Sequence, residues 1–418
     1  MAYTVIKSNA NDGDFMLTSY KHTLRASYLG HITQAIINNF TPLLFLTFSS
    51  QYGLPLYKIT LLVTINFLLQ LSVDFAAASF VDKIGYRKCI VTAHLFCTVG
   101  LLFLGTLPNI MSSPFTGLMI SLFFYALGGG LIEVLIAPIV EACPSENKES
   151  NMSLLHFFYS FGHVGVVVIS ALFFFFFGIK NWHILSIIWA CVPLLNMIYF
   201  LCVPIYTLPE ENNREFTVGK LFSSKIFLLF ILLMFLSGAS EQSMNQWASA
   251  FAESALLNTS LSKYAKILGD LCGPCIFALM MGLSRLLYSK FTKKIDLEHL
   301  MTLCSGLCAT AYLCCAVSPQ AFVKLFCCGF CGLCMGIAWP GLYLMMPKYC
   351  RGAGTASFAL LALGGDLGCA VGPTVVGLIS DANDSLFFGI FLAGIFPILL
   401  TCGLLFLKII FKVKKKEN

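Results

Sequence analysis

The chain has 418 residues, of which 58% are hydrophobic and only 11% are charged, and its formal net charge is +6. Soluble domains carry roughly 25% charged residues, so this composition excludes a water-soluble globular protein. The positive charge does not form a basic patch with interleaved aromatic residues, and we therefore expect no binding of nucleic acid. The composition instead indicates a protein whose solvent is the lipid bilayer.

Apolar stretches long enough to cross a bilayer occupy nearly the whole chain. A hydrocarbon core about 30 Å thick needs roughly 20 residues of α-helix. Lipid cannot hydrogen-bond a bare backbone, and the alternation typical of barrel strands is absent, so these stretches are predicted to be helices. We expect an all-α membrane protein with twelve transmembrane helices, at residues 28–48, 59–80, 89–107, 116–141, 152–178, 182–206, 226–251, 268–288, 299–317, 321–346, 354–379 and 386–411.

The distribution of basic residues predicts the orientation in the membrane. Lys and Arg accumulate in short cytoplasmic loops. If both termini are cytoplasmic, most of the 26 basic residues lie on that side, and the exceptions, at or near outer helix ends, are Lys58, Lys180, Lys263, Lys266 and Lys324. We therefore expect a multi-pass protein of the plasma membrane with both termini in the cytoplasm.

The longest polar connection, 207–224, divides the predicted helices into two sets of six. This predicts an N-terminal bundle at 1–206, a cytoplasmic linker at 207–224 and a C-terminal bundle at 225–418. A shift of about 204 positions carries Asn66 onto Asp270 and Asn38 onto Gln242, so polar positions recur at matching depths. Duplicated halves are a recurring transporter design, with the substrate near the midplane between them. We expect two pseudo-symmetric six-helix bundles.

A signature lies between the second and third predicted helices, formed by Ala78, Asp82, Lys83, Gly85, Tyr86, Arg87 and Lys88. It resembles the loop motif of the major facilitator superfamily, although Ala78 replaces the usual glycine. The resemblance implies a conformational latch, with Asp82, Lys83, Gly85, Arg87 and Lys88 as gating residues; a simple solvated turn is the alternative. A degraded second copy contains Gly282, Arg285, Tyr288 and Lys290, and we interpret it as a positively charged inner loop.

Five carboxylates fall within apolar stretches, where a charge costs several kcal/mol and suggests function. We expect no Lys or Arg at comparable depth. An unpaired buried carboxyl group can bind and release protons near neutral pH, so we predict proton coupling, with Na⁺ as an alternative ion. His94, His156 and His163 are alternative relay members, although His94 suits a packing role better. The candidate acids are Asp74, Glu133, Glu241, Asp270 and Asp366.

The fourth and fifth predicted helices resemble the fucose permease branch of that superfamily, through Gly128, Gly130, Glu133, Pro138, Pro144, Glu146, Leu154, His156, Phe158, Ser160, Phe161 and Gly162. The resemblance implies proton-linked sugar symport, with Glu133 as the helix-4 acid and His156 and Tyr159 as sugar contacts. Asn38 and Asn39 match an amide pair of that branch, but Pro42 stands where the branch has an acid. Coupling would then depend on Glu133 with another acid, or be lost.

Amide side chains predict a polar, hydrogen-bonding substrate. Gln34 and Asn38 lie one helical turn apart, as do Gln242 and Gln246 at repeat-equivalent places. Amides donate and accept hydrogen bonds, which suits hydroxyl groups, and amphipathic rings can cover the apolar side of a sugar. The alternative is that the amides hold helices together. The candidate rings are Tyr159, Trp247 and Trp339.

Together these features predict a secondary transporter that moves a sugar or similar small polar solute with protons by alternating access. We expect no enzyme activity, because the sequence contains no phosphate-binding loop, nucleophile elbow or zinc-protease motif. Nor do we expect a cofactor or metal; most of the 18 cysteines lie within helices as small apolar residues. We expect a monomer. The alternatives are a proton-coupled antiporter that exports amphipathic compounds or drugs, suggested by abundant Phe and Met, and a non-transporting receptor or scaffold.

Overall fold

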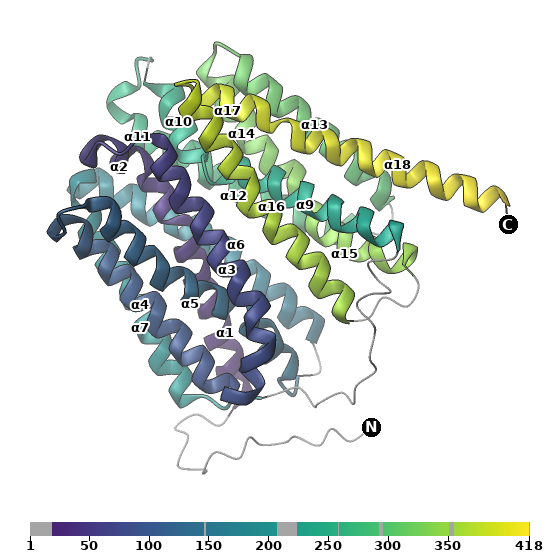
Figure 1. Ribbon diagram of the computed structural model, residues 1–418, viewed down its shortest axis with the longest axis horizontal. Helices are drawn as coiled ribbons and strands as arrows, with labels where there is room; N and C mark the ends of the chain where they lie inside the picture. The colour runs from purple at the N-terminus through teal and green to yellow at the C-terminus, as the bar shows by residue number, and fades with distance from the viewer. Residues whose placement is uncertain are drawn as a thin grey trace. The chain divides into compact units, whose positions relative to one another are not determined.

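The computed structural model describes residues 19–145, 148–206, 224–257, 259–291, 296–350 and 355–417. These ranges consist of helices and their connections and contain no strand (Figure 1). Within the helices, the side chains of 74, 78–80, 82, 148–150, 152–153, 289–291, 347–348, 355–359 and 410–417 lie outside the description. The expected all-α fold is confirmed.

The chain divides into two compact units. The first comprises residues 1–47 and 68–214, and the second comprises residues 48–67 and 215–418. Residues 48–67 belong with the second unit, where the backbone N–H of Tyr57 donates to Asp381 at 3.1 Å and Thr64 contacts Thr374 through their hydroxyl groups. The predicted ends of the two bundles, at residues 206 and 225, rest on the polarity of the sequence alone. Polarity carries no information about these contacts, so the bundle boundaries stay a prediction.

Two long helices of the first unit begin at serine side chains that accept a hydrogen bond from the first helical turn, Ser19 and Ser113. Ser113 accepts a hydrogen bond from the backbone of Thr116, with Pro114 at the first helical position, where its missing N–H costs nothing. Gly85, with φ 95°, separates two helices in a conformation that favours glycine. The elements are α1 (Tyr20–Asn39), η1 (Thr41–Leu44), the later part of α3 (Leu56–Ile84), α4 (Tyr86–Ile110), α5 (Pro114–Ala142), α6 (Lys148–Phe177), η2 (Ile179–Asn181) and α7 (Trp182–Cys202).

The second unit contains several membrane-length segments that are divided into two shorter helices. One division is a π-helical turn, η4, which contains Pro274. Most of α2 (Phe45–Tyr52) and the start of α3 belong to this unit. Its other elements are α9 (Lys225–Asn245), α10 (Ala248–Leu256), η3 (Ser262–Tyr264), α11 (Ala265–Asp270), η4 (Leu271–Cys275), α12 (Ile276–Phe291), α13 (Leu297–Val317), α14 (Ala321–Met335), α15 (Ala338–Tyr349), α16 (Thr355–Ala382), α17 (Leu386–Ala393) and α18 (Ile395–Glu417).

In the described part of the chain, eleven helical segments are long and apolar enough to cross a membrane. The predicted stretch 28–48 is not among them, because α1 carries His31, Gln34, Asn38 and Asn39 and ends before the apolar η1 and α2. It is nevertheless helical through most of its length, as the twelve-helix prediction requires. The first membrane-length segment is therefore the most polar one.

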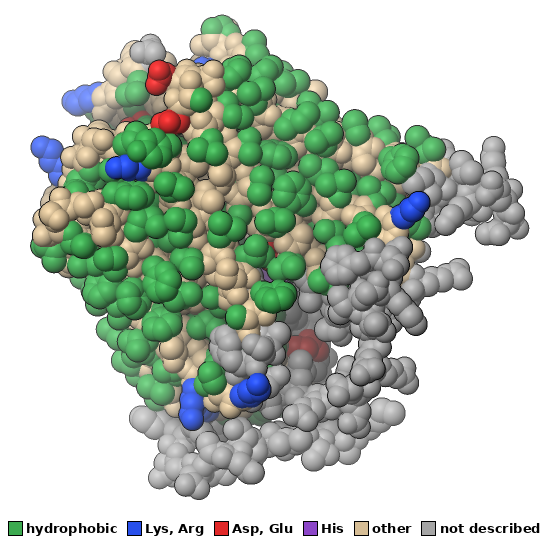
Figure 2. Space-filling model, viewed as in Figure 1, with side chains coloured by type: hydrophobic (Ala, Val, Ile, Leu, Met, Phe, Trp, Pro, Cys, Tyr) green, Lys and Arg blue, Asp and Glu red, His purple; other side chains and the backbone are tan. Residues whose placement is uncertain are grey.

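The molecular surface is largely apolar, which fits contact with lipid rather than water. Figure 2 shows hydrophobic side chains over most of the visible face, with few charged side chains among them. Large hydrophobic side chains are well exposed; Phe75 and Phe322, for example, are each 78% exposed. A soluble protein of this size would bury such residues.

Close helix contacts depend on glycine. A Cβ atom at Gly128 of α5 would lie 2.5 Å from the backbone oxygen of Ala93 in α4. In the second unit, a Cβ at Gly368 of α16 would clash with the backbone oxygen of Phe235 in α9. These helix pairs approach backbone to backbone, as small residues permit in membrane proteins. Gly364 and Gly368, on either side of Asp366, are thus explained by close packing of α16 on α9.

Candidate functional site

Four polar side chains of the first unit form a continuous hydrogen-bonded group, which we call the Glu133 network. Gln34 Nε2 donates to Glu133 Oε2 at 3.0 Å and to Gln70 Oε1 at 3.2 Å. Gln70 Nε2 in turn donates to Asn38 Oδ1 at 2.9 Å. The network joins α1, α3 and α5, so the structure brings together three of the predicted site residues, Gln34, Asn38 and Glu133, through Gln70.

The positions of these side chains follow from helical spacing and one glycine. Gln34 and Asn38 lie one turn apart on α1 and therefore share a face. Across from them on α5, a Cβ at Gly129 would approach Gln34 Oε1 to 3.2 Å and Ile37 to 3.1 Å, closer than side chains normally pack. The absence of a side chain at Gly129 gives the amide its room beside Glu133.

The network runs from buried to accessible atoms. Gln34 and Gln70 are buried, Asn38 is half-buried, and Glu133 is exposed. Gln34 Oε1 is buried and has no hydrogen-bond partner in the described structure. An unsatisfied buried acceptor is costly. The network therefore contains one unpaired acceptor, close to the exposed residue Glu133.

Three rings lie close together on α1 and α6. The His31 ring is 5.8 Å from that of His156 and 6.1 Å from that of Tyr159, centroid to centroid. His31 Nδ1 lies 3.0 Å from the backbone oxygen of Leu155, which orients the imidazole. His156 is exposed and Tyr159 is half-buried. The predicted pair, His156 and Tyr159, is thus joined by a third ring.

Sequence reasoning missed His31 and Gln70 as site residues. Asn66, Gln70 and Asp74 follow one another at intervals of four positions and so share one face of a helix, but this spacing leaves the partners of Gln70 open. His31 precedes Gln34 by three positions and Asn38 by seven, so all three share one face of α1. That spacing was the signal that could have identified His31.

Other predicted residues of the first unit have different surroundings. Asn39 is buried, and its Nδ2 donates to the backbone oxygen of Ala35 at 2.9 Å, within its own helix. The structure thus does not bring Asn39 into the Glu133 network. Asp74 and Asp82 have side chains outside those that the structure describes.

Two of the three histidines considered as relays are fully buried. His94 Nδ1 lies 2.8 Å from the backbone oxygen of Ile90, and its Nε2 lies 2.9 Å from Asn196 Nδ2, which also donates to Ala26. These contacts join α4, α7 and α1, and this is the packing role that we favoured. His163 is buried, with neither ring nitrogen hydrogen-bonded in the described structure.

The predicted gating loop contains a clear structural contact. The guanidinium group of Arg87 donates from Nη1 to the backbone oxygens of Phe200 and Leu201 and from Nη2 to that of Val203, at 2.8, 3.2 and 2.8 Å. These are carbonyl groups that the end of α7 leaves without helical partners. Arg87 therefore caps α7. Of the other described gating candidates, Gly85 is a turn residue with positive φ, and Lys83 and Lys88 are exposed cations.

A second polar group, the Gln242 cluster, lies at the end of α9 and consists of Glu241, Gln242, Asn245 and Gln246. Gln242 Oε1 lies 3.2 Å from both Asn245 Nδ2 and Gln246 Nε2, and Gln242 Nε2 donates to Glu241 Oε1 at 3.4 Å. Helix α9 ends at Asn245, just as α1 ends after Asn38. The predicted repeat of amides therefore coincides with a repeated helix end.

Asn245 is a member of this cluster that the sequence analysis did not select. It follows Gln242 by three positions, a spacing that places both on one helix face. The predicted ring Trp247 does not join the cluster, because its side chain is fully buried and donates to the backbone oxygen of Pro373 at 2.9 Å. Trp339 is half-buried and packs on Gly365, next to the half-buried Asp366.

The expectation that the candidate acids lack basic neighbours is wrong for Asp270. Lys266 Nζ lies 2.8 Å from Asp270 Oδ1. Lys266 precedes Asp270 by one helical turn, so both side chains reach the same side of α11. Glu133 differs, since its described hydrogen-bond partner is an amide.

The interpretation of Arg285 as part of an inner loop is also wrong. It lies within α12, is half-buried, and donates from Nε to the backbone oxygen of Gly336 at 3.2 Å. Gly336 follows the last residue of α14, where the helix leaves carbonyl groups unpaired. The sequence motif could not reveal this, because the receiving carbonyl is about fifty positions away along the chain.

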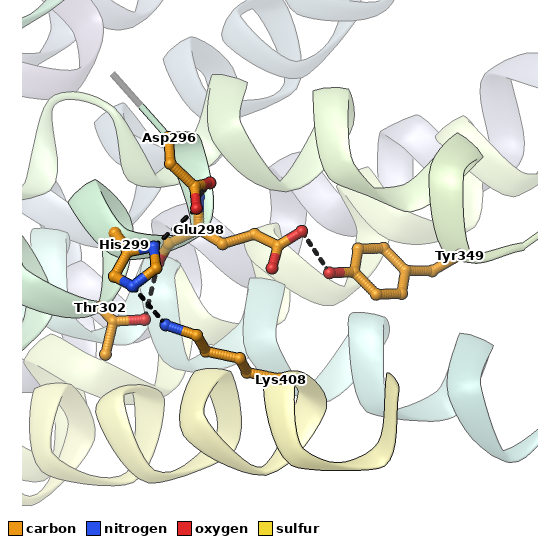
Figure 3. Close-up of polar contacts among 6 residues, drawn as sticks. All are labelled: Asp296, Glu298, His299, Thr302, Tyr349 and Lys408. Carbon is orange, nitrogen blue, oxygen red and sulfur yellow. Dashed lines mark hydrogen bonds and ion pairs between the residues drawn. The ribbon is translucent and has the colours of Figure 1, made fainter. Parts of the chain in front are cut away.

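A further polar group of the second unit lies at helix ends (Figure 3). His299 Nδ1 is 2.6 Å from Asp296 Oδ2, and Lys408 Nζ of α18 is 2.7 Å from His299 Nε2. Tyr349 of α15 donates to Glu298 of α13. The hydrogen bond with His299 holds the pKa of Asp296 below its ordinary value of 3.8. These contacts join the start of α13 to α15 and α18.

Metal chemistry has no support in the described residues, which contain no group of three or more His, Cys, Asp or Glu side chains placed to hold a metal ion. All the cysteines are free thiols. The chemistry that the site offers is hydrogen bonding and proton binding.

The fold and these polar groups define a multi-pass helical membrane transporter. A family model described as Major Facilitator Superfamily matches residues 28–373, and the chain belongs to that superfamily. Its members are transporters rather than enzymes. Comparison with curated proteins gives no match.

Solved structures with the same fold have various substrates. A bacterial homologue of the human lysosomal transporter Spinster, in an inward-facing conformation, has a TM-score of 0.73 at 14% identity, covering 92% of this chain and 96% of that one. The nucleoside transporter NupG has a TM-score of 0.72 at 13% identity, with 92% and 98% covered. The fucose:proton symporter FucP of E. coli, in a singly substituted form, has a TM-score of 0.62 at 16% identity, with 92% and 98% covered. Such low identities establish the fold alone, and they do not single out the fucose permease branch.

Proposed function

We propose that this protein is a secondary active transporter that carries a small polar solute, such as a sugar, across the plasma membrane together with protons. The observation that carries the proposal is the Glu133 network, in which a proton-accessible carboxylate shares a hydrogen-bond donor with neighbouring amides. Both termini are placed in the cytoplasm, as the distribution of basic residues predicts, and the protein acts as a monomer.

The network suits a solute with hydroxyl groups. Gln34 and Asn38 present amide groups, and amides both donate and accept hydrogen bonds. Gln34 Oε1 has no partner in the described structure and could accept a hydrogen bond from a solute hydroxyl. The neighbouring Tyr159 and His156 add polar ring atoms and an apolar ring face, a combination that fits the two sides of a sugar.

Coupling follows from the change that a proton makes at Glu133. As a carboxylate, Glu133 only accepts hydrogen bonds and holds the Nε2 group of Gln34. Once protonated, it becomes a donor and its attraction for Gln34 weakens, because hydrogen bonds to a charged acceptor are the stronger ones. Gln34 is then released to bind solute. Proton binding thereby favours solute binding, which is the linkage that symport needs.

The second unit contributes the repeat-equivalent amides of the Gln242 cluster. Gln242 is half-buried and Gln246 is buried at the end of α9, next to the buried acid Glu241. We assign this cluster the solute contacts of the second unit. Asp366 and Trp339, half-buried on α16 and α15, are further candidates there.

The test is uptake by liposomes that contain the purified protein. With an inward proton gradient, a panel of labelled hexoses, polyols and nucleosides should include at least one solute that accumulates inside. Glu133→Gln should abolish accumulation while retaining exchange of labelled for unlabelled solute, because a neutral side chain permits binding but cannot carry the proton. Glu141→Gln, the same substitution two turns further along α5, is the matched control and should accumulate solute normally.

Other results would contradict the proposal in distinct ways. Accumulation that survives Glu133→Gln would remove Glu133 from coupling. Accumulation driven by a sodium gradient instead would replace the proton by Na⁺. Proton-driven extrusion of amphipathic compounds would identify an exporter, and absence of any solute movement would favour a receptor or scaffold.

A further inference from the structure

Two short helices of the second unit hold a compact group of charged side chains, which we call the Asp270 cluster: Ser249, Glu253, Lys266 and Asp270. Lys266 Nζ lies 2.8 Å from Asp270 Oδ1, 3.1 Å from Ser249 Oγ and 3.8 Å from Glu253 Oε2. Ser249 also donates to Asp270 Oδ1. Ser249 and Glu253 come from α10, and Lys266 and Asp270 come from α11.

The cluster is largely removed from solvent. The side chain of Asp270 is fully buried, and those of Lys266 and Glu253 are each 18% exposed. A Cβ at Gly269 would lie 2.7 Å from the backbone nitrogen of Glu253, so α11 approaches α10 at this point as closely as its backbone allows. The charges therefore interact in a poorly hydrated space, where each imbalance is costly.

The charges of the cluster do not balance. It contains two carboxylates but one ammonium group, so it carries one negative charge in excess. The excess negative charge lies on carboxylate oxygens that are not satisfied. Asp270 Oδ2 and Glu253 Oε2 are both buried and have no hydrogen-bond partner in the described structure. A buried carboxylate with an unsatisfied oxygen costs several kcal/mol. The arrangement lacks one positive charge.

The missing positive charge is better supplied by a proton than by a metal cation. The ammonium group of Lys266 already lies against both acids, and a second cation beside it would be repelled. The described residues of the cluster offer two carboxylates, fewer than the three ligand side chains of a metal site. A proton between two neighbouring carboxyl groups relieves their repulsion and satisfies their oxygens. We infer that the Asp270 cluster binds one proton, shared by Asp270 and Glu253, at a site separate from Glu133.

Other titratable groups on the elements packed around α11 leave this count unchanged. They are thiols, a tyrosine and two lysines, each of which lies over an aromatic ring: Lys263 at 5.6 Å from the ring of Tyr264 and Lys324 at 3.3 Å from that of Phe387. By element they are Lys263 and Tyr264 on η3, Cys272 and Cys275 on η4, and Lys324, Cys327, Cys328, Cys331 and Cys334 on α14.

The cluster is placed to act on the backbone. Asp270 is the last residue of α11 and is followed directly by the π-helical turn η4, which contains Pro274. Single π-helical turns are frequent at functional sites, where the helix departs from its regular hydrogen bonds. Binding of the shared proton weakens the ion pair between Lys266 and Asp270, and Asp270 directly precedes this irregular turn. The proton site is thereby connected to the segment that joins α11 and α12.

This inference does not rest on the proposed function, because proton binding can be measured without any solute. Purified full-length protein in detergent is titrated from about pH 9 to about pH 5, the range in which a shared proton should bind. The double variant Glu253→Gln with Asp270→Asn should take up one proton fewer than the wild type. Ser249→Ala, which removes a hydroxyl group but no charge, should take up the same number. Helical circular dichroism confirms folding.

Several results would overturn the inference. Equal proton uptake by the double variant would mean that both acids stay charged, and a loss of two protons would mean two independent acids. Suppression of the uptake by sodium would assign the site to a metal cation. If the double variant does not fold, Glu253→Gln alone serves: infrared spectra of the wild type should contain a protonated carboxyl band below neutral pH that this variant loses, and its persistence contradicts the sharing of a proton.

Discussion

The side-chain amide of Gln34 donates through one nitrogen to Glu133, 3.0 Å away, and to Gln70, 3.2 Å away. One side chain therefore holds the acid on α5 and the amide on α3 in place at the same time. A change of charge at Glu133 acts directly on the amides that are proposed to contact the solute.

Replacing Gln34 by Leu should weaken solute binding. The variant loses the amide that is proposed to bind the solute, and each hydrogen bond that the solute can then no longer make leaves a polar group unsatisfied, at a cost of about 1–3 kcal/mol. We expect affinity for the transported solute to fall roughly tenfold or more, measured by equilibrium binding to the purified protein.

A neighbouring amide supplies the control for that prediction. Asn39→Ala removes a hydrogen bond to the backbone of Ala35 and should leave solute affinity unchanged. If Asn39→Ala weakened binding as much as Gln34→Leu, the boundary of the Glu133 network would be wrong.

Glycine at 128 should be required for stability. A Cβ there would lie 2.5 Å from the backbone oxygen of Ala93, which cannot rotate away, so Gly128→Ala should destabilise the protein by about 1–3 kcal/mol. Gly165→Ala on α6 is the control, because no atom lies within 4 Å of its Cβ position. Alanine is a better helix former than glycine, so this variant should be as stable as the wild type or slightly more stable. Thermal unfolding in detergent measures both, and equal melting temperatures for the two variants would contradict the close contact of α4 and α5.

Arg87 should contribute to stability through the end of α7. Arg87→Ala leaves the carbonyl groups of Phe200, Leu201 and Val203 without their donor, and we expect a loss of about 1–3 kcal/mol. Lys88→Ala, at the exposed neighbouring position, should change stability by less than about 0.5 kcal/mol. Arg87→Lys tests geometry, since a single ammonium group cannot reproduce the fork that contacts three carbonyls. Full stability of Arg87→Lys would mean that charge alone is needed.

The contacts at the start of α13 predict a pH dependence at low pH. The hydrogen bond with His299 is the main cause that lowers the pKa of Asp296 in the folded protein. A group with a lowered folded pKa stabilises the fold above its unfolded value, here 3.8, and that stabilisation is lost as the pH falls through the folded pKa. Asp296→Asn should therefore melt slightly below the wild type at neutral pH, and the difference should disappear in the acid range below about pH 4.

The measurement is the melting temperature in detergent against pH for both proteins. The expected difference is small, because Asp296 and His299 are both more than half exposed, at 58% and 67%, and solvent weakens polar interactions between exposed side chains. A difference that is constant with pH would mean that Asp296 acts through its shape or its helix cap rather than through its charge.

Much of the fold could be predicted because lipid imposes simple requirements on sequence. Every predicted span coincides with a described helix or with consecutive helical segments. The divisions within spans were missed, because the turns after Asn39 and Asn245 and the π-helical turn before Ile276 interrupt the backbone without interrupting the apolar pattern. Hydropathy reports the surroundings of a residue and not its hydrogen-bond partner.

The candidate site was predicted in part. Helical spacing places Gln34 and Asn38 on one face, and the resemblance implies a role for Glu133, but neither could show that Gln70 joins them. The same limit produced the errors. Lys266 and Arg285 were assigned to helix ends or loops by position in the chain, although their long side chains reach Asp270 and the backbone oxygen of Gly336. Trp247 was chosen for its chemistry, and its full burial against Pro373 became evident only from packing.

By itself, the sequence determined that this chain is a helical membrane protein and where its helices run, because each helix satisfies its own backbone and must match the thickness of the bilayer. Only the tertiary structure decided which polar side chains meet. Hydrogen bonds and ion pairs act over about 3 Å between helices far apart in sequence, so the partners of Glu133 and Asp270 depend on how those helices pack.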